Sequence, residues 1–166
     1  MMKTFKRTFT LIIGILTIGV FQSVNADWLI DSDGGISAGD AQDIVISLKS
    51  DPKREPEEAC LAVTFARSLS GGANVTLFVT LDGVTLADND VIKKRRLKCD
   101  TPWGEISLKE NLIAFLDDND NNMVVCPLCW DSRYDDDELP DYGFLPPEGS
   151  TAIGKMMFDA DKILDF

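Results

Sequence analysis

The chain has 166 residues, a formal net charge of -12, four cysteines and no histidine. The absence of histidine excludes Ser-His-Asp and Cys-His catalysis, histidine-ligated metals and imidazole acid–base chemistry. The acidic balance disfavours phosphate backbones and anionic lipid, so we expect neither nucleic acid nor a membrane surface among the partners. Any chemistry therefore depends on thiols, carboxylates, lysine or arginine.

The first 26 residues have the layout of a secretory signal peptide. Three basic residues come first, Leu11–Phe21 is almost entirely apolar, and Val24-Asn25-Ala26 supplies the small residues that a signal peptidase reads. The apolar stretch is short for a membrane span, and an uncleaved anchor is the alternative. We therefore predict a periplasmic protein, in a compartment that permits disulfides.

The remainder divides into a short arm and one domain. Residues 27–42 are polar and glycine-rich, which predicts a flexible arm, and residues 43–166 have the length of a single domain. Strands and helices alternate along the domain, which predicts an α/β fold with a parallel sheet. The expected strands are 43–50, 73–84, a run beginning at 122, and 162–166; the expected helices begin near 56, 106 and 151.

Helical spacing defines an apolar face on each of the first two expected helices. Pro56 fits the first helical position, because its missing N–H would have no intrahelical partner there. The basic segment at 91–104 shows no periodicity, and we expect it to be an irregular connection. The residues predicted to be buried are Leu61, Ala62, Phe65, Ala66 and Leu69 in the first helix, and Leu108, Leu112, Phe115 and Leu116 in the second.

Three sequence features follow expected strands. They are the loop after Leu48, the turn Asp82-Gly83-Val84, and the pair Cys126 and Cys129 in "VVCPLC". In open α/β sheets, sites lie beyond the carboxyl ends of the strands. We therefore expect these three features to meet at one edge of the sheet.

The pair Cys126 and Cys129 has several interpretations. It could be a redox dithiol, a thiol that carries sulfur, half of a zinc site, or a buried structural disulfide. A helix opening at Cys129 would present amide donors that stabilise a Cys126 thiolate and lower its pKa. Zinc would need a second pair of cysteines, whereas Cys60 and Cys99 are single residues far apart in the sequence. We therefore predict no metal site.

The other two cysteines receive separate predictions. Cys60 lies near the apolar face of the first expected helix and is most simply a small core residue, with disulfide bonding as the alternative. Cys99 lies in the basic connection, where positive charge would favour a thiolate. We therefore expect Cys99 to be a mobile thiol able to resolve a mixed disulfide, in a loop that could attract anionic partners.

Three marks in order along 43–166 suggest a family. They are Asp82-Gly83-Val84 after the second strand, the strand-to-cysteine junction Val125-Cys126, and the closing "ADKILDF" of residues 160–166. Together they make the domain resemble the DsrE-like family, which includes sulfur-relay subunits and exported relatives. The resemblance implies a three-layer α/β/α domain with a mainly parallel sheet, assembled into trimers or hexamers.

The resemblance also implies roles for two cysteines. In sulfur-relay members a cysteine after the central strand carries a persulfide, and Cys126 is the matching position here. Cys129 matches the second cysteine of the exported C-P-x-C relatives. The chain departs from the cytoplasmic relay members in its expected signal peptide and in this second thiol.

The leading hypothesis is an exported protein that handles sulfur or thiol redox equivalents. Cys126 would attack or bind sulfur, and Cys129 would resolve the resulting species. The expected partners are a sulfur donor or acceptor protein or a small sulfur species, and no cofactor is expected. The alternative is a non-catalytic oligomeric binding module in which the two cysteines form a structural disulfide.

Overall fold

A computed structural model describes residues 41–94, 97–118, 121–135 and 137–166. The expected signal peptide and all but the last two residues of the expected arm lie outside this part. Within the described ranges, no helix has the length and apolar character needed to cross a membrane.

The described elements follow the predicted alternation, except that the second strand, expected over 73–84, ends at Val79 and is followed by a 3-10 helix that begins at Leu81. Four strands belong to one sheet, and two more form a separate hairpin. The elements are β1 Gln42–Leu48, α1 Pro56–Leu69, β2 Ala73–Val79, the 3-10 helix η2 Leu81–Ala87, α2 Asn89–Lys94, β3 Lys98–Thr101, β4 Gly104–Ser107, α3 Leu108–Leu116, β5 Asn122–Val125, α4 Pro127–Asp131, α5 Ser150–Asp159 and β6 Lys162–Asp165.

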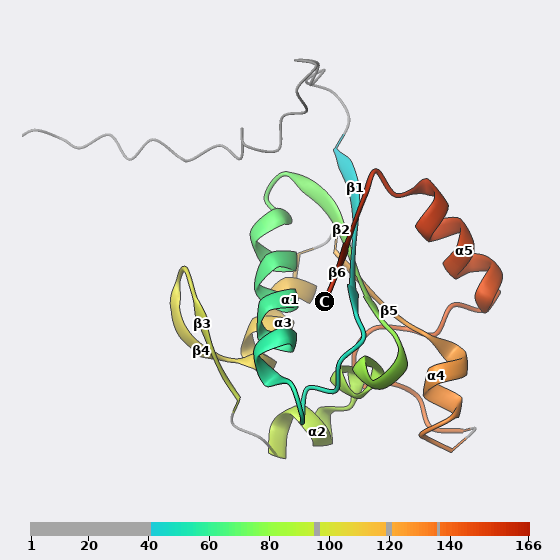
Figure 1. Cartoon of the computed structure of the whole chain (residues 1–166), viewed down its shortest axis with the longest axis horizontal. Coiled ribbons are helices and arrows are strands. Elements are labelled where there is room, and N and C mark those ends of the chain that lie inside the picture. Colours follow the sequence, from blue (N-terminus) through green and yellow to red (C-terminus); the bar gives the residue numbers. More distant parts are fainter. Residues whose placement is uncertain (1–40, 95–96, 119–120, 136) are drawn as a thin grey trace, which may run out of the picture. The chain divides into compact units, whose positions relative to one another are not determined.

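The main sheet has the strand order β5-β2-β1-β6, and every pairing in it is parallel. Helices α1 and α3 cover one face and α5 covers the other (Figure 1). The prediction of an α/β domain with a parallel sheet is thus confirmed. Because all four strands run in one direction, their carboxyl ends lie along one edge of the sheet.

Helix α1 begins at Pro56, as predicted, but its buried face differs from the prediction. The buried stripe consists mainly of small residues, Ala59, Ala62, Val63 and Ala66, which let the helix lie close to the sheet; Leu69, at its end, is buried as predicted. Leu61 and Phe65, which the apolar spacing assigned to the core, are 47% and 37% exposed. The prediction was wrong for these two because the size of the available space, and not hydrophobicity alone, selects which face packs.

Helix α3 starts at a capping box, in which the Ser107 hydroxyl accepts from the Glu110 amide and the Glu110 carboxylate accepts from the Ser107 amide. Leu108, Leu112 and Phe115 are fully buried, as expected from their spacing, whereas Leu116, also predicted to be buried, is only half-buried. Each reciprocal hydrogen bond satisfies a donor that the first helical turn would otherwise leave unpaired.

The basic connection is not irregular, which corrects the prediction made for it. It contains α2 and the antiparallel hairpin β3–β4, which lies on the outer side of α1 and α3 (Figure 1). Cys99 in β3 is bonded to Cys60 in α1. Cys60 is therefore not a free core thiol, and Cys99, only 1% exposed, is not a mobile resolving thiol. At the hairpin turn, the Arg67 guanidinium lies 4.3 Å from the Trp103 ring centroid.

The outer edge of β5 is covered by the chain near Phe144. The Val125 amide donates to the Phe144 carbonyl (2.9 Å), and the Phe144 amide donates to the Met123 carbonyl (3.0 Å). Gly143 approaches this strand so closely that an added Cβ would lie 2.5 Å from the Met123 carbonyl oxygen. The segment therefore closes a strand edge that would otherwise present unpaired backbone groups.

Candidate functional site

The carboxyl ends of the strands are joined by a line of backbone hydrogen bonds. The Cys126 amide donates to the Val79 carbonyl (3.0 Å), and the Thr80 amide donates to the Leu48 carbonyl (3.0 Å). These bonds continue the sheet one residue past β2 and β5. They place Thr80 and Cys126 beside each other on neighbouring chain segments.

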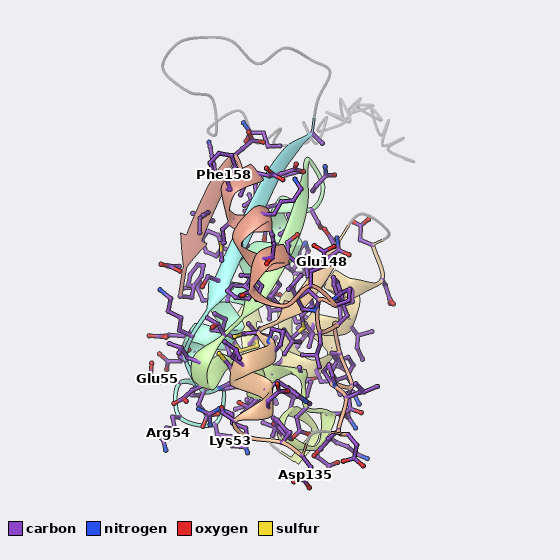
Figure 2. All side chains as sticks on the ribbon, turned by 90° about the vertical axis from the view of Figure 1, so that its right-hand side faces the viewer. Lys53, Arg54, Glu55, Asp135, Glu148 and Phe158 are labelled. Carbon is purple, nitrogen blue, oxygen red and sulfur yellow. A yellow bond between two sulfur atoms is a disulfide. The ribbon has the colours of Figure 1, made fainter. Side chains whose placement is uncertain are left out.

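The three sequence features expected at this edge do meet there. The Gly83 amide donates to the Lys49 carbonyl (2.9 Å), which joins the Asp82-Gly83-Val84 turn to the loop after Leu48. Figure 2 shows Lys53, Arg54 and Glu55 of that loop at the same end of the domain as Asp135, which follows α4. The convergence inferred from topology is therefore present in the structure.

The dithiol lies at the start of α4. Cys126 is the N-cap residue, Pro127 occupies the first turn, and Cys129 follows within that turn. Both cysteines are free and half-buried, and their sulfur atoms are 2.6 Å apart. A disulfide bond is about 2.05 Å long, so a small movement separates the dithiol from the disulfide.

Trp130 anchors this five-residue helix. It is 2% exposed, its ring stacks on Tyr134 at 3.9 Å, and its Nε1 donates to the Glu138 carbonyl (2.7 Å). The Tyr134 hydroxyl donates to an Asp88 carboxylate oxygen (3.1 Å), and burial together with Asp88 raises the pKa of Tyr134. A helix this short has little stability of its own, so these contacts hold the two thiols in place.

The segment η2 faces the dithiol and is itself tightly fixed. An ion pair between Asp82 and Arg133 connects it to the chain just after α4. A Cβ at Gly83 would lie 2.3 Å from the Leu48 carbonyl oxygen, so only glycine fits this crossing. Leu81 has a φ of 49°, in the left-handed region that a residue with a Cβ rarely adopts. Such backbone strain is characteristic of functional sites.

The two thiols have unlike surroundings. Cys126 packs against the apolar cluster of Val45, Phe78 and Val124 beneath α5. The Cys129 sulfur lies 3.4 Å from the Thr80 hydroxyl oxygen. One thiol therefore contacts the core, and the other contacts a polar group at the end of β2.

These surroundings shift the two pKa values in opposite directions. Burial, followed by the Cys129 thiol, raises the pKa of Cys126, and the weaker lowering effects of the Cys129 backbone amide and the Thr80 hydroxyl do not reverse this. For Cys129, burial acts to raise the pKa but is outweighed by the Cys126 thiol, the Thr80 hydroxyl and the Leu81 amide, so the pKa is lowered. The lowering of the Cys126 pKa expected from the helix amides is not what the full environment produces.

The sequence predicted Cys126 and Cys129 as site residues but gave no prediction for Thr80 and Leu81, which the structure places beside them. The parallel pairing of Val79 with Val125 makes Thr80 the neighbour of Cys126. The sequence signal for Thr80 was therefore a polar residue directly after β2, the strand next to β5. The left-handed turn at Leu81 has no comparable signal, because non-glycine residues seldom adopt it.

No metal centre is found in the described part of the chain, where no three His, Cys, Asp or Glu side chains are grouped to hold an ion. The disulfide between Cys60 and Cys99 also removes two of the four cysteines as free thiolate ligands. A four-cysteine zinc site is therefore incompatible with this pairing.

Comparison with known proteins gives a likeness of fold. No family model matches the chain, and no curated protein matches it. The crystal structure of the YchN protein from E. coli, which has a DsrE-like fold, is similar with a TM-score of 0.51 and 21% sequence identity. The match covers 75% of this chain and 99% of that chain. The described domain is thus an α/β domain similar in fold to a DsrE-like protein.

Proposed function

We propose that the chain is an exported protein that handles sulfur or thiol redox equivalents through Cys126 and Cys129. The observation that carries the proposal is the pair of free sulfur atoms, 2.6 Å apart, at the carboxyl edge of the parallel sheet. This edge is where open α/β sheets place their sites, and adjacent thiols can close a disulfide after one of them has reacted.

In thiol exchange, a cysteine thiolate attacks one sulfur of a partner disulfide. A mixed disulfide forms, and the partner's other sulfur leaves as a thiolate. The second cysteine, as a thiolate, then attacks the sulfur of the first cysteine and releases the remaining partner sulfur. Two electrons pass to the partner, which becomes a dithiol, while Cys126 and Cys129 become a disulfide.

With a polysulfide, the same pair handles sulfur. The first thiolate attacks a polarised sulfur, a shorter polysulfide leaves, and a persulfide is formed on the cysteine. The second thiolate attacks the cysteine sulfur of that persulfide, forming the disulfide and expelling hydrosulfide. The cysteines are oxidised and the transferred sulfur is reduced, so a thiol reductant must restore the dithiol for another cycle.

Mass spectrometry of the reduced protein after brief polysulfide treatment tests the proposal. We expect the wild type to take up sulfur and then to convert to the disulfide, with loss of two hydrogens. Cys126→Ser and Cys129→Ser each block the second step, so the variant that retains the attacking thiol should accumulate a stable persulfide. The double variant is the matched control, because the bonded Cys60 and Cys99 offer no thiol.

Two outcomes contradict this function. One is no sulfur uptake by the wild type, and the other is equal uptake by the wild type and the double variant. The alternative of a binding module with a structural disulfide predicts a Cys126–Cys129 bond that survives mild reductant. A count of thiols under native and denaturing conditions separates the two functions.

Export and assembly form part of the proposal. The basic and apolar organisation of residues 1–26 supports export to the periplasm, which cell fractionation tests. The family resemblance supports a trimer or hexamer, as does exposed apolar surface such as Phe158, which is 88% exposed (Figure 2). Light scattering of the purified mature protein measures the assembly, and a monomer at all concentrations would contradict it.

A further inference from the structure

Two polar groups at the end of β2 face one sulfur of the dithiol. The Thr80 hydroxyl oxygen lies 3.4 Å from the Cys129 sulfur. The Leu81 amide acts on the same sulfur, from a residue whose φ of 49° turns the chain out of the sheet. The Cys126 sulfur is also 2.6 Å from the Cys129 sulfur and packs against the apolar cluster under α5. The Thr80 hydroxyl also acts on the Cys126 sulfur, but its 3.4 Å contact is with Cys129, on which the Leu81 amide and the Cys126 thiol act as well.

We propose that Thr80 is the positioning residue of the dithiol, and that its hydrogen bond to the Cys129 sulfur selects Cys129 as the thiolate that attacks first. This inference rests on the proposed function and reverses the order of attack expected from the sequence. A thiolate has no proton, so the hydroxyl must donate when Cys129 is ionised, and a charge-assisted hydrogen bond is among the stronger kinds.

The fold gives Thr80 a fixed position for this task. Its amide donates to the Leu48 carbonyl at the carboxyl end of β1, which anchors its backbone to the sheet. The Cys126 amide donates to the carbonyl of Val79, the residue before Thr80, and this bond anchors the start of the cysteine segment. Two adjacent backbone hydrogen bonds thus fix the backbone of Thr80 and of Cys126, the N-cap residue of the helix that carries Cys129.

The reaction follows from this selection. The Cys129 thiolate attacks the partner sulfur and forms the mixed disulfide or persulfide. The hydrogen bond from Cys126 to Cys129 is then lost, and the Cys126 proton passes to solvent or to the departing thiolate. The Cys126 thiolate attacks the Cys129 sulfur, forms the intramolecular disulfide and expels the partner sulfur. Cys126 is thus the resolving thiol.

The test measures the pH dependence of alkylation by iodoacetamide in the Cys126→Ser background, where Cys129 is the reactive thiol. Thr80→Val keeps the shape of the side chain and removes the hydroxyl, whereas Thr80→Ser keeps the hydroxyl. We expect Thr80→Val to raise the midpoint and to slow alkylation about tenfold below it, since a hydrogen bond to a charged group is lost. Thr80→Ser should retain most of the rate.

Thr76→Val is the matched control, because it makes the same change four residues earlier in β2, about 13 Å along the strand. It should leave the midpoint unchanged. In the wild type, peptide mapping after limited alkylation should find label on Cys129 before Cys126.

The inference is overturned if Thr80→Val leaves the midpoint unchanged, if Thr80→Ser is as slow as Thr80→Val, or if Cys126 is labelled first. Circular dichroism of each variant identifies loss of folding, in which case Thr80→Ser and the labelling order still decide. Failure of the proposed function gives a different result, because the thiols would then alkylate as expected while the wild type took up no sulfur from polysulfide.

Discussion

The chain contains two cysteine pairs that differ in almost every physical respect. Cys60 and Cys99 are 39 residues apart in sequence and are bonded, joining α1 to the hairpin β3–β4. Cys126 and Cys129 lie within one helical turn, are free, and sit half-exposed at the edge of the sheet. The two pairs thus have the same residue type but differ in loop length, bonding and position in the fold.

Loop length explains why the second pair suits reversible chemistry. A disulfide stabilises a fold mainly by restricting the unfolded chain, and its effect grows with the length of the closed loop. A bond between Cys60 and Cys99 closes a long loop, whereas one between Cys126 and Cys129 closes a very short one. Opening and closing the short loop therefore changes the stability of the domain little.

The largest expected effect comes from removing the bonded pair. Cys60→Ala with Cys99→Ala should lower the free energy of unfolding by about 3–4 kcal/mol, because the loop between them is no longer constrained. Urea unfolding followed by circular dichroism measures the change. Cys126→Ser with Cys129→Ser is the matched control and should change stability by less than about 1 kcal/mol. Equal losses in the two double variants would remove the distinction between the pairs.

The next largest effect is expected at Gly83, where η2 passes close to the end of β1 beside the free pair Cys126 and Cys129. Gly83→Ala should destabilise the domain by about 1–3 kcal/mol, since the added Cβ would lie 2.3 Å from the Leu48 carbonyl oxygen. It should also slow alkylation of Cys129, because η2 would shift. The control is Gly154→Ala in α5, where nothing lies within 4 Å of the added Cβ. That helical substitution should stabilise by about 0.5–1 kcal/mol.

A smaller effect is expected where the hairpin that carries Cys99 joins α3. Ser107→Ala removes the capping box between β4 and α3 and should cost about 1 kcal/mol of stability in thermal or urea unfolding. Ser107→Thr retains a hydroxyl cap and should keep most of it. Neither substitution should change the alkylation rate of Cys129, and a change would show that the two regions are coupled.

The smallest expected effect is a pH dependence of stability caused by the free thiols Cys126 and Cys129. The lowered pKa of Cys129 contributes stability that is present above its unfolded value and is lost as the pH falls through the folded value. The raised pKa of Cys126 contributes stability that is present below its unfolded value and is lost as the pH rises through the folded value.

Stability of the reduced protein should therefore rise through a window below the ordinary thiol pKa and fall through a window above it. Urea midpoints measured across these windows check the two trends. Both should disappear in Cys126→Ser with Cys129→Ser, in which neither thiol titrates. If the trends persist in that variant, other groups cause them.

Much of the sheet could be predicted from the sequence because its strands and helices are marked by local physics. Pro56 marks the start of α1, and the β-branched run in β1 indicates a buried parallel strand. The carboxyl-edge position of Cys126 then follows from the alternation of elements. These inferences need only neighbouring residues, and they held.

The features that were not predicted depend on contacts between residues far apart in the sequence. The bond between Cys60 and Cys99 could not be deduced, since cysteine connectivity does not follow from sequence alone. The hairpin β3–β4 lacks a clear alternating pattern because its four-residue strands lie on the outside of α1 and α3, not in the sheet. The approach of Thr80 to Cys129 depends on the register between β2 and β5.

The position of Trp130 has an optical consequence. Its indole ring is shielded from water and belongs to the residue directly after Cys129, whereas Trp103 is half-exposed on the hairpin. A buried indole emits at shorter wavelength than an exposed one, and a nearby disulfide quenches its emission. Oxidation of Cys126 and Cys129 should therefore dim the short-wavelength part of the protein's own fluorescence, which gives a label-free signal for following the redox state of this pair in real time.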